Sequence, residues 1–278
     1  MHRFFVSPDS IDGSVIVFGT EVSHRIARVL RSRSGETVIA LDGTGWEHTV
    51  VLDSVDSDRT SGTISAKRRA EGEPLVHLTV YQGVLKGRRF ETVLQKGTEL
   101  CVSHFVPVMC ERSVPTRTDS REQVKLKRWR NVLSEAAEQS RRGLIPTVSG
   151  PVEFRGACDS ATLPAIMPWE EERSLGLREV VSQARKEGEF ASYSVFVGPE
   201  GGFTREEVEY AVSRGILPVT LGPRILRADT APVAVAAALM YELGELGGQT
   251  YSRVRARPRR LATALSIGTP WKSTSFVA

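Results

Sequence analysis

Two glycine-bearing loops, each directly after an apolar run, are the parts of this chain best suited to hold a ligand. The run 194–197 continues into the loop 198–204 (GPEGGFT), and the run 216–221 continues into the loop 222–227 (GPRILR). Because glycine lacks a Cβ atom, such a backbone can turn sharply and approach a ligand closely. Neither loop has G-x-G-x-x-G spacing, and no G-x-x-x-x-G-K-[ST] occurs, so the common dinucleotide and phosphate-binding motifs lose their support.

The pattern around these loops predicts an α/β domain. Short apolar runs at 76–81, 104–109, 165–167, 195–197 and 216–221 alternate with helical segments at 88–100, 121–141, 174–187, 204–215 and 231–243. Strands that alternate with helices predict a parallel sheet with helices on both faces. Thr204 and Glu207 predict a capping box at the start of one of these helices. Ligands of such sheets bind outside the carboxyl ends of the strands, where the two loops would meet.

The first 72 residues follow another pattern. β-Branched runs at 15–18, 37–41, 48–52 and 62–66, with one helix near 21–30, predict a small β-barrel. A polar, turn-rich linker at 67–74 separates it from the α/β part, so we expect domains at 1–72 and 74–246. Residues 247–278 carry six Lys or Arg and no acidic residue, which is typical of a flexible basic tail.

Composition limits the class of protein. A chain of 278 residues can hold two domains, and no apolar run reaches the roughly 18–20 residues of a membrane span. The N-terminus has no apolar stretch long enough for a signal peptide, so we expect a cytoplasmic location. Cys101, Cys110 and Cys158 are odd in number and widely spaced, which favours buried free thiols. The five histidines show no ligand-like spacing, so we expect no metal site.

Positive charge is concentrated in the middle of the chain. The net charge is +4, but residues 74–150 carry thirteen Lys or Arg against seven Asp or Glu. This local excess of positive charge indicates a docking surface for a polyanion. A solvated helix face without a partner would give the same count, so charge alone leaves both interpretations open.

Several segments together resemble the ribosomal small-subunit methyltransferase E family. They are the two loops, the opening MHRFF, and the segments 86–91 (KGRRFE), 95–100 (QKGTEL) and 138–142 (EQSRR), and in chain order they span residues 1–246. The resemblance implies a SPOUT-type parallel sheet with a C-terminal trefoil knot, plus an N-terminal PUA-like RNA-binding β-barrel. It also implies a homodimer that methylates N3 of a uridine in 16S rRNA of the small ribosomal subunit, with S-adenosylmethionine as the methyl donor.

The resemblance implies that the two loops and the segment 167–169 hold S-adenosylmethionine. The residues expected to bind the cofactor are Met167, Gly198, Glu200, Gly201, Gly202, Leu221, Gly222, Ile225, Leu226 and Arg227.

The acceptor side needs other groups, because N3 of uracil bears a proton whose loss spreads negative charge onto O2 and O4. A cation or donor aimed at these oxygens stabilises that charge. Arg142, Arg224 and Arg227 are the candidates, and Arg142 matches the Arg that ends the family's Glu-Gln-Ser-x-Arg motif. Arg227 could instead pair with Glu200. Asp229 could take the proton or orient a water, although family members often carry Glu there, which weakens a direct general-base role.

N3 lies on the Watson–Crick edge, so the target base must be unpaired or flipped out. We expect phosphate contacts from Lys86, Arg88, Arg89, Arg142 and Arg224, with further basic residues between 112 and 130. Two alternatives remain: a SPOUT methyltransferase that acts on another RNA base, and a non-catalytic RNA-binding ribosome-assembly factor. The intact glycines and the Arg-Ile-Leu-Arg segment argue against the non-catalytic alternative.

Overall fold

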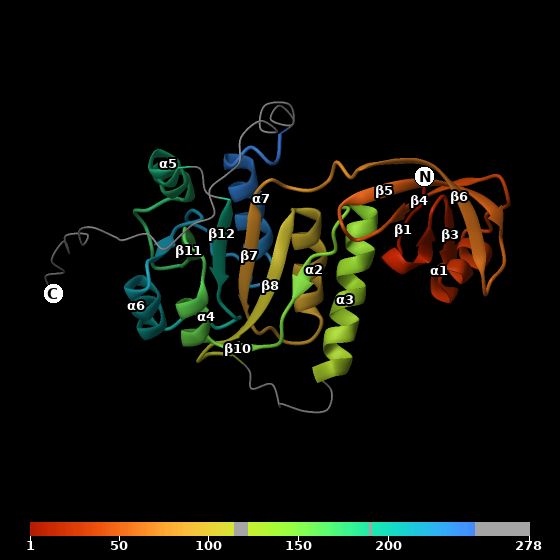
Figure 1. Ribbon diagram of the computed structural model, residues 1–278. Coiled ribbons are helices and arrows are strands. Elements are labelled where there is room, and N and C mark those ends of the chain that lie inside the picture. Colours follow the sequence, from red (N-terminus) through yellow and green to blue (C-terminus); the bar gives the residue numbers. More distant parts are fainter. Residues whose placement is uncertain (114–121, 189–190, 248–278) are drawn as a thin grey trace, which may run out of the picture.

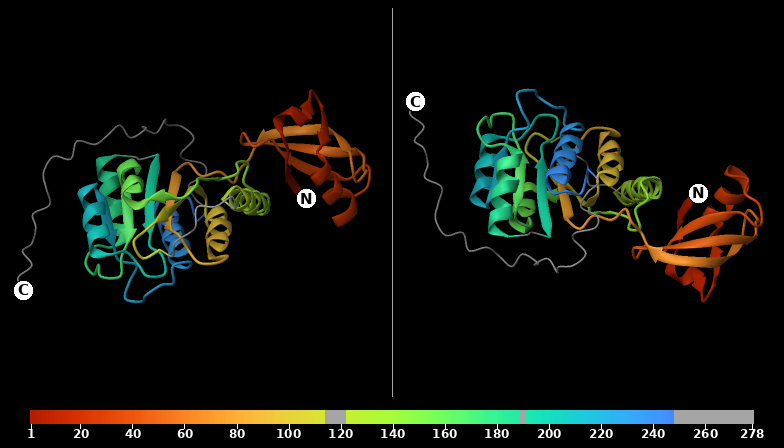
Figure 2. Two further views of the ribbon diagram at one scale, coloured as in Figure 1. Left: turned by 90° about the horizontal axis from the view of Figure 1, so that it is seen from below. Right: turned by 90° about the horizontal axis from the view of Figure 1, so that it is seen from above.

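The computed structural model describes residues 1–113, 122–188 and 191–247, and within these ranges the chain forms two separate sheets (Figure 1). Two further views show them as distinct lobes, with the N-terminal sheet at one end of the molecule (Figure 2). The predicted basic tail lies outside the described residues from position 248 onward, as do Arg117 and Arg121.

The N-terminal lobe is a curled sheet of six strands in the order β1-β4-β5-β6-β3-β2. All pairs are antiparallel except β1 with β4. Phe4, Ile16, Phe18 and Ile26 form part of its core. The bounds are β1 Arg3–Phe5, β2 Ile11–Asp12, β3 Val15–Phe18, β4 Thr37–Leu41, β5 Trp46–Ser54 and β6 Thr60–Arg69, with a short helical turn Pro8–Ser10 and with α1 Thr20–His24 running on into a π-helical turn Arg25–Val29.

The C-terminal lobe is the predicted parallel sheet, in the order β10-β8-β7-β12-β11-β13, with β9 also paired to β8. Its strands are β7 His77–Gly83, β8 Val102–Met109, β9 Thr147–Val148, β10 Val152–Glu153, β11 Ala165–Pro168, β12 Ser192–Val197 and β13 Ile216–Val219. Its helices are α2 Arg89–Glu99, α3 Glu122–Gln139, α4 Phe154–Ser160, α5 Leu177–Glu187, α6 Arg205–Ser213 and α7 Ala231–Glu242. The sequence analysis missed β9, β10 and α4, which are all short. In the described ranges, no helix has both the length and the apolar composition needed to cross a membrane.

Helices cover both faces of the parallel sheet because successive side chains of its strands point in opposite directions. On β7, Leu78 and Val80 lie in the core shared with α2, α5 and α7. Tyr81 points to the other face, towards α4 and α6, and stacks on Phe196 with ring centroids 4.3 Å apart. The strands therefore have apolar residues on both faces, as is usual for a parallel sheet.

The three cysteines are unpaired. Cys110 and Cys158 are buried, and burial raises the pKa of both thiols, that of Cys158 to about 12. Cys101 is half-buried, and its thiol pKa is also raised by burial. Thiols with such pKa values are protonated at neutral pH and are poor nucleophiles.

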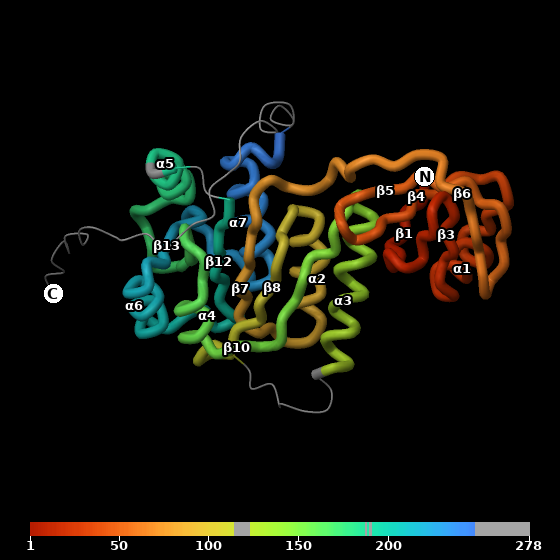
Figure 3. Tube along the Cα trace, in the orientation of Figure 1, coloured from red at the N-terminus to blue at the C-terminus, as the bar shows by residue number. Residues whose placement is uncertain are grey.

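The joint between the two lobes is built from the end of α3 and the linker that precedes β7 (Figure 3). The Glu138 carboxylate accepts a hydrogen bond from the Phe5 backbone N–H at 3.0 Å. It also forms an ion pair with the Arg25 guanidinium at 2.7 Å. Arg142 is only 3% exposed and donates to the backbone oxygen of Val102 at 2.6 Å and to the Glu73 carboxylate at 3.1 Å. The segment 138–142 therefore holds the lobes together.

Arg142 is thus buried in the joint, whereas the sequence analysis expected it beside the acceptor base and the RNA. Its guanidinium is bonded to groups at the amino-terminal end of β8, and it does not line the pocket described below. Burial and these bonds leave it unable to reach an RNA phosphate or a base in this structure. The residue type alone gave no sign of this, because an exposed and a buried Arg look the same in a single sequence.

The joint yields a stability prediction. Glu73 accepts hydrogen bonds from Arg142 and from the backbone N–H groups of Gly143 and Leu144. Glu73→Ala would leave a buried guanidinium without its counter-ion, so we expect a loss of about 3 kcal/mol in the free energy of unfolding.

Glu71→Ala is the matched control, because within the described ranges Glu71 pairs with the exposed Arg68 alone, at 3.4 Å. We expect it to cost less than about 0.5 kcal/mol. Urea unfolding followed by circular dichroism measures both values. Equal costs for the two variants would show that the buried pair does not stabilise the joint.

Candidate functional site

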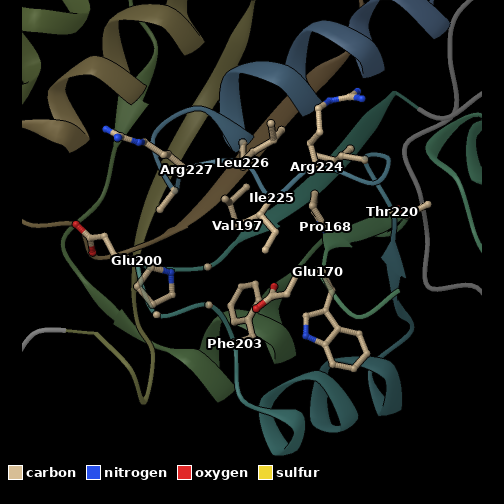
Figure 4. Close-up of a pocket in the computed structure, with 18 of the residues that line it drawn as sticks. Pro168, Glu170, Val197, Glu200, Phe203, Thr220, Arg224, Ile225, Leu226 and Arg227 are labelled. Carbon is tan, nitrogen blue, oxygen red and sulfur yellow. The ribbon is translucent and has the colours of Figure 1, made fainter. Parts of the chain in front are cut away.

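A pocket of about 520 Å³ lies where the parallel strands end. It is formed by the loops that follow β11, β12 and β13, together with the first residue of α2 (Figure 4). The predicted cofactor residues that line it are Gly198, Glu200, Gly201, Gly202, Leu221, Gly222, Ile225, Leu226 and Arg227. Met167 does not line it: its side chain is fully buried in the core, and Pro168, Trp169 and Glu170 line the pocket in its place.

The loop after β12 is fixed by the end of β7. A Cβ atom on Gly83 would lie 2.4 Å from the backbone nitrogen of Pro199, so only glycine lets the loop pass this close. The buried Gln82 amide donates to the backbone oxygens of Gly83 and Gly198, both at 3.1 Å. The Gln82 side chain at the end of β7 thus fixes the backbone just after the neighbouring strand β12.

The outer side of the same loop is held by Arg112. Its guanidinium donates to the backbone oxygen of Gly201 at 3.0 Å, so the structure places Arg112 on the loop, whereas the sequence analysis gave it an RNA phosphate. A Cβ atom added to Gly201 would lie 3.0 Å from the Cβ atom of Arg112, so this residue has little room for a side chain. Gly202 has φ +70°, a conformation that favours glycine, and the predicted capping box of Thr204 and Glu207 starts α6 directly after it.

The loop after β13 is shaped by its own hydrogen bonds. Gly222 has φ +98°, and its N–H donates to the Thr220 hydroxyl at 3.1 Å. The Arg227 carbonyl accepts from the N–H groups of Thr230 and Ala231, both at 2.9 Å, which begins α7. The loop therefore turns back over the ends of β12 and β11 and leads directly into a helix.

Charged side chains surround an apolar centre in this pocket. Glu200 accepts from Arg89 at 3.2 Å and from the Lys86 backbone N–H at 3.0 Å, so its ion pair is with Arg89, and the alternative pairing with Arg227 is not formed. The side chains of Arg224 and Arg227 run outward from the pocket, whereas Glu170 points into it, towards Ile225 (Figure 4). Lys86 and Arg88 are exposed close to this edge.

Two further findings concern residues that could carry chemistry. Asp229 is half-buried at the end of the second loop and is not part of the pocket lining. Gln82, Gly83 and Glu170 support or line the site, yet the sequence analysis did not select them. A buried Gln in an apolar strand and a Gly at the end of that strand were the available signals for the first two.

Comparisons with known proteins agree with this geometry. A family model described as an RNA methyltransferase domain matches residues 71–240. The ribosomal RNA small subunit methyltransferase E of Bacillus subtilis is 32% identical over 238 residues, covering 84% of this chain and 91% of that protein. The protein of the same name from Synechocystis is 30% identical, with coverage of 85% and 76%.

Two solved structures share the whole fold. The ribosomal RNA small subunit methyltransferase E of Neisseria gonorrhoeae, bound to S-adenosyl methionine, superposes with a TM-score of 0.77 at 31% identity over 87% of this chain and 97% of that one. A methyltransferase from Legionella pneumophila in complex with the same cofactor gives 0.73 at 25% identity, with the same coverage. The chain belongs to the ribosomal RNA small subunit methyltransferase E family.

Proposed function

We propose that this protein transfers a methyl group from S-adenosylmethionine to N3 of a uracil in 16S rRNA. One observation carries the proposal: two glycine loops close over a pocket of about 520 Å³ at the strand ends, in a chain whose relatives are crystallised with this cofactor. That volume is in the usual range for a pocket that encloses a small molecule. Because the proposed substrate is ribosomal RNA, we also propose that the protein acts in the cytoplasm.

The pocket residues fit such a cofactor. Val197, Leu226 and Ala231 offer apolar surface to a flat base, and the loop backbones offer amide and carbonyl groups to its polar edge. When bound, the cofactor supplies an electrophilic methyl group. The role of the chain is to hold that methyl towards the incoming base and to exclude water from it.

The basic residues around the mouth of the pocket bind the acceptor base. Arg224 and Arg227 line the pocket and are exposed, so their guanidinium groups can swing towards the O2 and O4 atoms of an incoming uracil. They replace Arg142 in this role. Asp229 lies next to the second loop, and we assign it support of that loop, with the imide proton leaving to water.

RNA contacts extend from the pocket towards the N-terminal lobe. Lys86 and Arg88 are exposed at the start of α2, and Arg89 bridges the pocket and this surface. We propose that the curled N-terminal sheet is the PUA-like module, which would bind RNA away from the target base. The two lobes then correspond to the domains expected at 1–72 and 74–246.

Two properties of the family, the trefoil knot and the homodimer, concern the region around α7. We propose that the C-terminal segment forms the trefoil knot of the family, and its support is that the chain runs from β13, at the edge of the sheet, back to α7 against β12 and α2. A homodimer would cover exposed apolar side chains of this region, namely Ile225 in the pocket lining, which is 87% exposed, and Tyr241 near the end of α7, which is 63% exposed. In that arrangement the partner copy completes the wall of the pocket.

The proposed activity is tested by nucleoside mass spectrometry of 16S rRNA from a strain that lacks the gene. We expect loss of one N3-methyluridine, restored by the parent gene. Loss of a different methylated base would support the alternative SPOUT activity, and an unchanged set of methylations would support an assembly factor.

The first loop predicts the effect of a side chain at Gly202. Gly202→Val must strain a φ of +70° and displace the Glu170 carboxylate, which lies 2.7 Å from the position of the new Cβ. We expect loss of S-adenosylmethionine binding by calorimetry.

Gly13→Val is the matched control, because Gly13 has φ +58° and open space around its Cβ position. Both variants should lose about 1 kcal/mol of stability from backbone strain. Only Gly202→Val should lose the cofactor. Equal cofactor affinity in the two folded variants would mean that the loop is a turn without a ligand.

The exposed basic residues predict a salt dependence. If Lys86 and Arg88 contact phosphates, the double change to Gln should reduce the slope of log K against log salt by about 1.4, the value for two phosphates of single-stranded RNA. Arg185 and Lys186 on α5, changed in the same way, are the control and should leave the slope unaltered. Filter binding to a 16S rRNA fragment at several salt concentrations measures it, and equal slopes for both double variants would exclude Lys86 and Arg88 from the RNA footprint.

A further inference from the structure

Glu170 lines the pocket, and its carboxylate has no partner among the residues that the structure describes. It follows β11, is exposed, and makes no hydrogen bond or ion pair with any residue in the described part of the chain. The close-up view shows its side chain directed inward, between Phe203 and Ile225 (Figure 4). The neighbouring Glu171 differs, because it pairs with Arg205 at 3.4 Å outside the pocket.

The other charges of the pocket do not neutralise Glu170. Glu200 is already paired with Arg89. Arg224 and Arg227 point outward, away from the Glu170 carboxylate (Figure 4). Its carboxylate instead rests against the glycine loop, 2.7 Å from the position of a Cβ on Gly202. Among the described residues that line the pocket, Glu170 therefore contributes one uncompensated negative charge, which is complementary to a cationic ligand.

The methyl donor and its product differ in charge. S-Adenosylmethionine has one ammonium, one carboxylate and a sulfonium, so its net charge is positive. S-Adenosylhomocysteine keeps the ammonium and the carboxylate but has a neutral thioether. A negative charge in the pocket therefore favours the methyl donor over the product, and a pocket without that charge would lose this preference.

We propose that Glu170 recognises the sulfonium charge of the methyl donor and so makes the pocket prefer S-adenosylmethionine over S-adenosylhomocysteine. This inference rests on the proposed function. It assigns Glu170 a role in cofactor specificity, and it favours release of the product: once the methyl is transferred, the attraction between the sulfonium and Glu170 is gone.

The test measures the affinity of three ligands by calorimetry, for the full-length parent, Glu170→Gln and the control Glu171→Gln. The ligands are S-adenosylmethionine, S-adenosylhomocysteine and sinefungin, which carries an amine cation in place of the sulfonium. Glu170→Gln removes a charge from an exposed side chain without changing its shape. We expect S-adenosylmethionine and sinefungin to bind about fivefold more weakly, the effect of one partly screened ion pair, and the product to change less than twofold.

Ionic strength gives a second readout. The preference of the parent for S-adenosylmethionine over the product should shrink as salt is raised, because salt screens the exposed charge, and that of Glu170→Gln should stay constant. Glu171→Gln should behave as the parent throughout.

Equal weakening of all three ligands by Glu170→Gln would show that the residue holds a group they share, and would overturn the proposal. Unchanged affinities would overturn it as well. A parent protein that binds none of the ligands would instead refute the proposed function, so the two failures are distinguishable.

Discussion

The pocket depends on one close contact, between Gly83 at the end of β7 and Pro199 in the loop after β12. A side chain at position 83 would lie 2.4 Å from the Pro199 nitrogen, so the loop could not pass over the end of β7. Gln82 reinforces the contact, since its buried amide bonds the backbone of the neighbouring strand end at Gly198. The positions of Glu200 and Gly202, and through them the mouth of the pocket, follow from this contact.

The second determinant is the joint between the lobes, which lies at the opposite end of the sheet from the pocket. Glu138 reaches the first strand of the N-terminal lobe, and Arg142 reaches Glu73 in the linker. An RNA bound across both lobes needs them at a fixed distance and angle. The segment 138–142 is therefore better explained by geometry between lobes than by contact with the reacting base.

The sequence predicted the parallel sheet and the two loops because strong local signals mark them. Apolar runs end in glycines, and the capping box of Thr204 and Glu207 is present as expected. The burial of Arg142 and Met167 away from the pocket lining was not predictable, because burial depends on neighbours far apart in the chain: the partners of Arg142 are Glu73 and Val102. Glu170 was missed for the same reason, since its place in the pocket is visible only once the segment after β11 lies beside the loop after β12. Gly83 had a local signal, its position at the end of an apolar strand, but its contact with Pro199 is visible only in the fold.

The central claim is that the methyl donor binds between the loops after β12 and β13. Hydrogen–deuterium exchange of the parent protein, with and without S-adenosylmethionine, tests it most directly. We expect slower exchange of backbone amides in 198–204 and 220–231, with no change in the joint segment 138–144. Protection confined to that joint would contradict it.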